Sequence, residues 1–179
     1  MAVMTEMNLA AGKDAESHRF NYKGMHRYLI TLYTFKSRKV FTEGAPVLKS
    51  LGILQEVCWK HRFDTYAYCF LPDRLVLIVR GKTEFSDMKA FLSAFRQASS
   101  MALEAELGHP LWKRIYTERV LRKKEESAEK ASEVFSLPVQ AGLVTVPSDY
   151  PYLGSFVKPA TTSSDRNKSK GRRPARRPG

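Results

Sequence analysis

Three segments of the chain are dense in aromatic and β-branched residues and predict β-strands. The first is Arg27 to Phe35, where two interleaved apolar sets are typical of a central strand covered on at least one face. The other two are Asp64 to Leu71 and Leu75 to Val79. Only Pro72, Asp73 and Arg74 separate the latter two segments, which is short enough for a hairpin.

Between and after these strands, apolar residues recur every three or four positions and predict two amphipathic helices. The first follows Gly44 and Pro46, starts at Val47 and ends near Arg62. We expect Ser86 to cap the second, which carries apolar residues from Met88 to Leu103 and ends at Gly108.

The order of these elements predicts an α+β protein with a ferredoxin-like βαββαβ core. Trp112 to Leu121 supplies the last strand of a four-stranded antiparallel sheet with helices packed on it. A charged helix from about 125 to 135 follows, and then an apolar stretch from 141 to 146. We divide the chain into a disordered leader, 1–21, one domain, 22–157, and a disordered tail, 158–179.

The charge of the chain points to a polyanionic partner. Lysine and arginine number 30 and aspartate and glutamate 18, which gives a formal net charge of +12. The tail from 158 holds eight basic residues and one acid, and it lacks the apolar residues needed for a core. Its composition fits a solubilising appendix as well as a nucleic-acid arm.

Two cysteines, Cys58 and Cys69, lie in apolar surroundings, which suits buried thiols in a reducing compartment. No apolar run approaches the roughly 18 residues of a membrane span, and no secretory signal opens the chain. We therefore expect a cytoplasmic protein without a membrane partner.

A four-stranded sheet with both helices on one face leaves its other face open, and in a basic protein such a face often binds nucleic acid. Residues 112–124 interleave Trp112 and Tyr116 with six cations, a pattern suited to phosphate contacts. An edge strand protected by charge from aggregation is an equal alternative. The four histidines and two cysteines show no metal-ligand spacing.

Four stretches of the sequence resemble a known family. They are Tyr28 to Phe41, which ends Lys-Ser-Arg-Lys-Val-Phe, Tyr66 to Gly81, Leu111 to Arg122 and Pro138 to Ser155. Together they resemble the REP-associated tyrosine transposases, a bacterial branch of the single-tyrosine HUH transposases. The resemblance covers about 22–157, and its last stretch is the most specific.

This resemblance implies a particular chemistry. Members of the family hold Mg²⁺ or Mn²⁺ with two histidines on a strand and attack DNA with a tyrosine on a later helix, cutting and rejoining single strands beside hairpins. The two histidine positions fall on Arg74 and Val76, neither of which offers a lone pair to a metal, and the tyrosine position falls on Glu133. We therefore expect a degenerate site that holds no metal and lacks nicking activity.

Alternatives at this site remain open. Tyr116 matches a non-catalytic tyrosine of the family and is expected to be structural. Glu133 and Arg74 could form an ion pair that closes the old site, or Arg74 could neutralise a phosphate where the metal once lay. An active transposase could take its metal ligands from His26, His61 or His109.

What remains of the implied function is binding of hairpin or single-stranded DNA, in a bacterial nucleoid, with RNA or protein binding on the same fold as an alternative. A homodimer is compatible with the fold, and a monomer is slightly favoured. The cations expected to contact DNA are Lys36, Arg38, Lys39, Arg74, Lys113, Arg114, Arg119, Arg122, Lys123 and Lys124.

Overall fold

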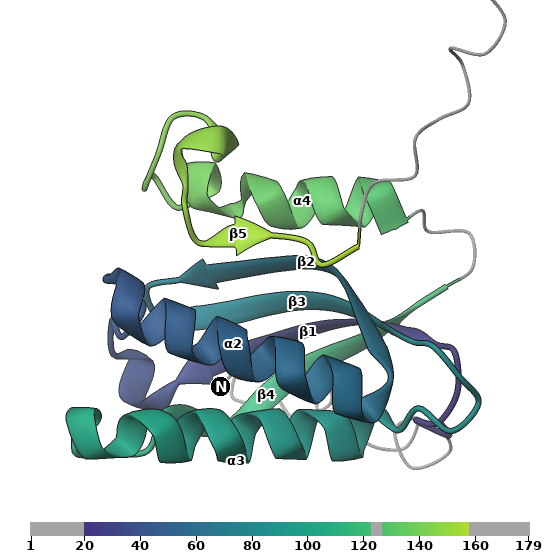
Figure 1. The fold of residues 1–179 in the computed structure, drawn as a ribbon. Helices are drawn as coiled ribbons and strands as arrows, with labels where there is room; N and C mark the ends of the chain where they lie inside the picture. The colour runs from purple at the N-terminus through teal and green to yellow at the C-terminus, as the bar shows by residue number, and fades with distance from the viewer. Residues whose placement is uncertain (1–19, 123–126, 158–179) are drawn as a thin grey trace, which may run out of the picture.

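The structure is a computed structural model that describes residues 20–122 and 127–157. A five-stranded antiparallel sheet runs through it in the order β4-β1-β3-β2-β5 (Figure 1). The elements, in chain order, are β1 (Arg27–Thr34), η1 (Phe35–Ser37), α2 (Gly44–His61), β2 (Phe63–Leu71), β3 (Arg74–Gly81), α3 (Met88–Leu107), β4 (Trp112–Leu121), α4 (Ser127–Gln140), η2 (Pro147–Asp149) and β5 (Leu153–Gly154).

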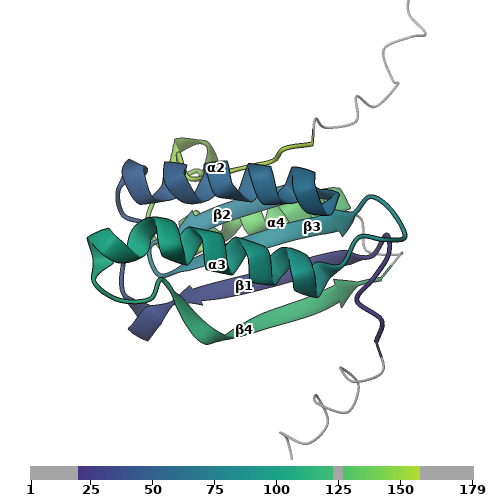
Figure 2. The same cartoon turned by 60° about the horizontal axis from the view of Figure 1, so that its bottom comes forward.

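The first seven of these elements confirm the α+β fold with a βαββαβ core, and each predicted strand and helix of that core is present. The strand order β4-β1-β3-β2 is the ferredoxin-like order. The two core helices, α2 and α3, lie side by side on one face of the sheet (Figure 2). Between them and the sheet is the main core, whose largest fully buried side chains include Tyr28, Phe41, Phe70, Phe91 and Phe95.

The helix ends follow local chemistry, with one difference from the prediction. Gly108 ends α3 with a left-handed φ of 66°, as the sequence indicated. The cap at the start of α3 is Asp87, whose Oδ1 accepts from the N–H of Ala90 at 3.0 Å, so the prediction of Ser86 was wrong. Ser86 is buried, and its Oγ donates to the carbonyl of Arg62 at 2.8 Å.

The second face of the sheet is not open along its whole width, and this corrects the sequence prediction. Helix α4 packs on it over β2 and β3, on the side opposite α2 and α3 (Figure 2). Its Ala131 and Val134 form a second apolar cluster with Val76, Ile78 and other sheet residues. The prediction placed this helix at 125–135 without a partner, whereas it continues through Pro138 to Gln140 and covers half of the face.

The segment after α4 returns to the edge of β2. The Tyr150 hydroxyl donates to the Phe70 carbonyl at 2.6 Å, and the Phe70 N–H donates to the Tyr152 carbonyl at 2.8 Å. Burial raises the pKa of Tyr150 to about 12. The predicted four-stranded sheet therefore gains a fifth, two-residue strand, which pairs Leu153 with Cys69.

Residues 1–19 of the predicted leader 1–21 lie outside the described residues. The whole of the predicted tail 158–179 lies outside them too, as do Lys123 and Lys124. Phe20, at the start of the described chain, packs against the main core. Among the helices that the structure describes, none combines the length and apolar character needed to cross a bilayer.

Candidate nucleic-acid interface

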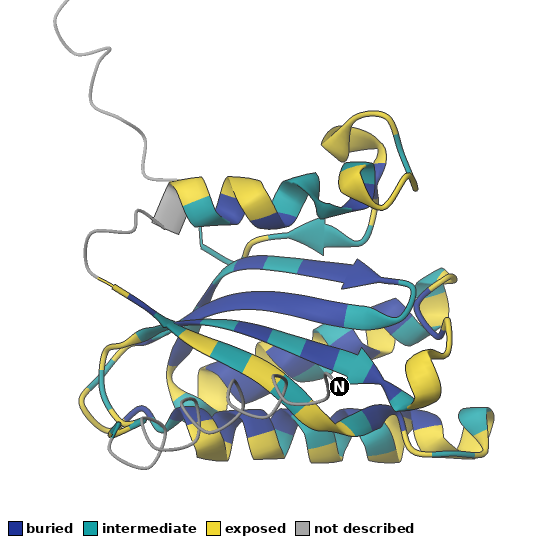
Figure 3. Cartoon of the chain, turned by 180° about the vertical axis from the view of Figure 1, so that it is seen from behind, coloured by how far each residue is buried: buried dark blue, intermediate teal, exposed yellow. Residues whose placement is uncertain are grey.

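The face of the sheet that carries α4 divides into two halves. We call the part over β2 and β3 the covered half, because α4 packs there, and the part formed by β1 and β4 the open half. Figure 3 shows the contrast, with β2 and β3 largely buried and β4 largely exposed or partly exposed. The open half is formed by outward residues of β1 and β4 together with the arginines at the two ends of β3.

The sequence resemblance places the family's two histidine positions at Arg74 and Val76. Both residues lie on β3, and Val76 faces α4. Val76 is buried, with 7% of its surface exposed, in the apolar cluster with Ala131 and Val134 of α4. On β2 its paired residue is Cys69, a thiol whose pKa burial raises to about 12, which makes it a poor donor to a metal. Val76, the second of the two positions given by the resemblance, is thus surrounded by apolar side chains.

Arg74 and Glu133 lie on facing elements but are not paired. Arg74 Nε is 3.5 Å from the carboxylate of its neighbour Asp73, and Glu133 on α4 bonds Lys130 at 2.6 Å. No ion pair joins Arg74 and Glu133, although both belong to the described part of the chain. The hypothesis of an ion pair between Arg74 and Glu133 is therefore wrong. Each side chain has a nearer partner on its own segment, Asp73 for Arg74 and Lys130 for Glu133.

A divalent metal does not fit these residues. Val76 has no donor atom, Arg74 is a cation, and Glu133 is engaged by Lys130. Across the residues 20–122 and 127–157, no group of three or more His, Cys, Asp or Glu side chains is placed to hold an ion. The alternative ligands are also dispersed: His109 packs on Phe35 beside η1, while His26 precedes β1 and His61 ends α2.

One end of the open half gathers several of the predicted cations around Tyr33. Arg74 is the cross-strand partner of Tyr33 on β3, and Lys113 Nζ lies 5.6 Å from the centre of the Tyr33 ring. Lys113 also donates to Ser37 Oγ at 2.8 Å, which ties β4 to the turn that carries Lys36. The exposed turn residues Arg38 and Lys39 follow. The structure thus brings the turn 36–39 and Lys113 together, a proximity that the sequence did not indicate.

The turn has an unusual backbone. Lys36 and Ser37 both adopt left-handed φ values, 53° and 56°, which non-glycine residues seldom adopt. The Thr34 hydroxyl, which bonds the carbonyls of Arg38 and Asp73 at 2.6 and 3.0 Å, clamps the turn against the hairpin that begins β3. The Lys36 ammonium then lies 5.4 Å from the Phe35 ring, so its charge is carried on a fixed turn.

The other end of the open half contains a pocket that the sequence did not indicate. Its volume is about 370 Å³, and it is lined by Met25, His26, Arg27, Arg80 and Leu121. Arg27 and Arg80 are cross-strand partners, and like charges directly opposite each other are unfavourable unless an anion lies between them. Arg80 contacts the Tyr66 hydroxyl at 3.5 Å. Neither arginine was predicted, because each lies within a strand that reads as apolar core.

Between these ends the open half is polar or only partly buried. Thr31 pairs with Thr117, and Leu29 pairs with Arg119, while Ile115 is 79% exposed. Arg119 and Arg122 are exposed and both have interaction partners. Glu118 of β4 lies on the α3 side, where it bonds Lys89 at 2.5 Å. No acid therefore stands among the outward residues of β1 and β4 on this face.

Two predicted residues have other surroundings. Tyr116 packs against the main core, and its hydroxyl accepts from Lys89 at 3.1 Å, so it does not belong to the open half. Partial burial lowers the pKa of Lys89, but its bonds to Glu118 and Tyr116 outweigh this and leave that pKa raised. Arg114 is exposed, and Arg96 of α3 donates to its carbonyl at 3.3 Å and to that of Lys113 at 2.7 Å.

Comparisons with known proteins bear on the fold. No protein-family model and no curated protein matches the sequence. Among solved structures, the chain is similar to a REP-associated tyrosine transposase bound to a REP hairpin, with 16% identity, a TM-score of 0.63, and coverage of 84% of this chain and 82% of that one. A candidate transposase of Deinococcus radiodurans R1 is 16% identical over 66% of this chain and 93% of its own, with a TM-score of 0.46.

The first of these similarities confirms the transposase-like fold that the sequence resemblance implied. At 16% identity, this similarity is evidence for the fold alone and not for a function. What the protein does has to be argued from its own surface.

Proposed function

We propose that this protein is a relative of the REP-associated tyrosine transposases that binds hairpin or single-stranded DNA and does not cut it. The observation that carries the proposal is the contrast on one face of the sheet. At the family's metal position Val76 is packed among apolar side chains, while the adjacent open half exposes cations at both ends. Binding of DNA requires only the cations of the open half and no metal site.

The open half suits a phosphate backbone in three respects. Arg27 and Arg80 present two guanidinium groups from adjacent strands to one pocket, an arrangement that a phosphate with several acceptor oxygens would satisfy. Arg74, Lys113 and Lys36 supply charge at the opposite end. The formal net charge of +12 favours association with any polyanion over long range.

DNA rather than RNA is the ligand that we propose, and two lines support it. The sequence stretches resemble a family that acts on DNA hairpins, and the fold is similar to that of a transposase bound to a REP hairpin. Loss of nicking is part of the proposal. It is supported by the residue types at the three positions given by the resemblance, because neither Arg74 nor Val76 can ligate a metal and Glu133 is not a tyrosine. Neither Mg²⁺ nor Mn²⁺ is needed for binding of this kind.

The experiment is a titration of the protein into a fluorescent DNA hairpin with a single-stranded flank. Arg27→Gln and Arg80→Gln each remove one charge-assisted contact, so each should weaken binding by about tenfold. Lys49→Gln is the matched control, because it removes the same charge from α2, where Lys49 pairs with Glu106. Equal losses in all three variants would reduce the interaction to net charge and overturn the proposed site.

An RNA hairpin of the same sequence and an unstructured strand serve as competitors. If DNA is the ligand, the RNA hairpin should compete less well than the DNA hairpin. Tighter binding of the RNA would favour an RNA-binding module on the same fold.

A further inference from the structure

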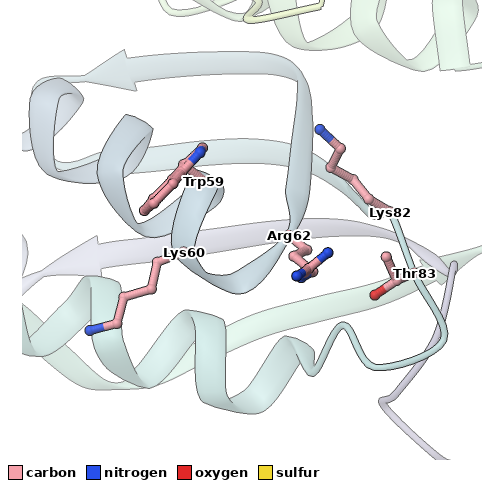
Figure 4. Close-up of a pocket in the computed structure, with 5 residues that line it drawn as sticks. All are labelled: Trp59, Lys60, Arg62, Lys82 and Thr83. Atoms are coloured by element: carbon pink, nitrogen blue, oxygen red, sulfur yellow. The ribbon is translucent and has the colours of Figure 1, made fainter.

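A second basic pocket lies beyond the open half, at the end of α2. It has a volume of about 380 Å³ and is lined by Trp59 and Lys60 of α2, by Arg62, and by Lys82 and Thr83 after β3 (Figure 4). None of these five residues was predicted to bind a ligand. Three of them are cations, and none is acidic.

Trp59 is the most exposed of the large apolar side chains in the described residues. It is 84% exposed, whereas the other tryptophan, Trp112, is 5% exposed and donates its Nε1–H to Ser99 at 2.8 Å. Phe85, close along the chain to Thr83, is 80% exposed. An aromatic ring left in water forgoes the stabilisation that burial would give it. Here the exposed Trp59 ring also lines a pocket together with three cations, which is what makes it a candidate ligand contact.

The backbone around this pocket is fixed by hydrogen bonds. Arg62 caps α2 in the left-handed conformation, with φ 59° and ψ 55°. Its carbonyl accepts from the N–H of Lys82 at 2.9 Å and from the buried Ser86 hydroxyl at 2.8 Å. The Ser86 oxygen in turn accepts from the N–H of Lys82 at 3.1 Å and from that of Thr83 at 3.2 Å. The two segments that carry the cations are therefore locked together.

Charge at this pocket is only partly neutralised. Lys82 Nζ is 3.4 Å from an oxygen of Asp64, an exposed pair that is worth little and is screened by salt. No ion pair to an acidic side chain of the described chain involves Lys60 or Arg62. The pocket therefore combines an exposed aromatic face with a positive rim, which is the combination that binds bases and phosphates of a single strand.

The pocket adjoins the open half through the end of β3. Gly81 donates to the His26 carbonyl at 3.0 Å on one side, and the next residue, Lys82, donates to Arg62. Arg80 lines the pocket of the open half, whereas Lys82 lines the pocket at Trp59. Arg80 and Lys82, two residues apart at the end of β3, thus place one cation in each pocket.

We infer that the pocket at Trp59 binds a nucleotide of a single-stranded nucleic-acid segment, with the base stacked on the indole and its phosphates held by Lys60, Arg62 and Lys82. This inference rests on the proposed function in one respect: the strand is the flank of the hairpin that the open half binds. A strand leaving the pocket of Arg27 and Arg80 has a cationic path to Trp59. The site is distinct from Arg74, Val76 and Glu133, which belong to β3 and α4, whereas α2 lies on the opposite face of the sheet (Figure 2).

The test uses the intrinsic fluorescence of the full-length protein. Trp112 is buried and supplies a constant background, so quenching by added oligothymidine reports on Trp59. Base stacking on Trp59 predicts saturable quenching that disappears in Trp59→Phe. In a titration with labelled strand, Trp59→Ala should bind about tenfold more weakly, while Trp59→Phe should retain most of the affinity.

Leu48→Ala is the matched control, since Leu48 is also on α2 and is 68% exposed. It should bind the strand like the unmodified protein. Absence of quenching, or equal affinity of Trp59→Ala and the unmodified protein, would overturn the inference.

The outcome can be separated from that of the proposed function. A blunt hairpin without a flank should bind Trp59→Ala and the unmodified protein equally, because it engages the open half only. Failure of the blunt hairpin to bind, with quenching by oligothymidine intact, would contradict the proposed interface and leave the Trp59 site standing. Binding of the blunt hairpin without quenching by oligothymidine would support the proposed interface and contradict the Trp59 site.

Discussion

The covered and open halves are adjacent parts of one sheet face, but their surfaces differ. The covered half is apolar and buried, whereas the open half is more exposed and carries cations. Over β2 and β3, α4 buries Val76 and Ile78 against Ala131 and Val134. Over β1 and β4 the described helices give less cover. Leu121 belongs to the same apolar cluster and Leu29 packs against it, but the other outward positions include Thr31, Thr117 and arginines. The two halves therefore differ in burial and in charge although they belong to one sheet (Figure 3). Fold and chemistry have to be argued separately.

The largest effect should come from placing the same charge in each half. Val76→Asp buries a carboxylate among apolar side chains without a partner, so we expect it to lower the free energy of unfolding by about 3–5 kcal/mol. Thr117→Asp, on the exposed strand, should change it by no more than about 0.5 kcal/mol but should weaken DNA binding. Denaturant unfolding and hairpin titration check the pair. Similar stability losses in both variants would contradict the division.

A second prediction concerns the backbone that joins the two basic pockets. A Cβ atom at Gly81 would lie 2.1 Å from the Gly24 carbonyl oxygen, so Gly81→Ala should cost about 1–3 kcal/mol in thermal or denaturant unfolding. At Gly52, within α2, an added Cβ meets nothing within 4 Å. Gly52→Ala should therefore stabilise the protein by about 0.5–1 kcal/mol, and an equal response at both positions would be incompatible with the close approach.

The salt dependence of binding sharpens the comparison further. If Arg27 and Arg80 each neutralise a phosphate, their double Gln variant should lower the slope of log affinity against log salt by about two. Val76→Ala, in the covered half, should leave the slope unchanged. Hairpin titrations at several salt concentrations measure both, and an unchanged slope in the double variant would place the phosphates elsewhere.

The smallest effect at neutral pH should come from the two buried cysteines, which lie on opposite faces of the sheet. Burial raises the pKa of the Cys58 thiol to about 11 and that of Cys69 to about 12, from an ordinary value of 9.0. Above pH 9 the unfolded chain loses these protons first, so stability should fall as the pH rises from 9 towards 12 and stay unaffected by these groups below 9.

Thiol reagents provide the measurement for the cysteines. Both thiols should react slowly in the native protein at neutral pH and fast after unfolding, because both are buried free cysteines. Rapid native reaction of Cys69 would show that α4 does not stay on the covered half.

Periodicity was enough to predict the core of this fold. The strand Trp112 to Leu121 appears as predicted, and the turn between β2 and β3 is one residue shorter than predicted, because Arg74 already belongs to β3. The cap at Asp87 was missed because Ser86 and Asp87 are both good caps, and only the burial of Ser86 beneath Arg62 decides between them. The cover that α4 provides was missed because its partner face lies more than 50 residues away in sequence.

The site was less predictable than the fold. Clustered cations such as Lys36 and Lys113 stand out in a sequence, and the structure joins them through Ser37. Arg27 and Arg80 each appear alone beside apolar runs, and only the strand register makes them a pair. Trp59 gave no signal, because a tryptophan in an amphipathic helix reads as core until the helix is seen to turn it outward.

The most direct test of the central claim incubates the protein with a palindromic DNA hairpin carrying a single-stranded flank, with and without Mn²⁺, and resolves the products on a denaturing gel. The same mixtures are assayed for binding at two salt concentrations. The account predicts saturable binding that weakens with salt, that the Arg27→Gln/Arg80→Gln variant impairs, and that leaves the DNA uncut. DNA cleaved by, or covalently attached to, the protein in a metal-dependent way would contradict it.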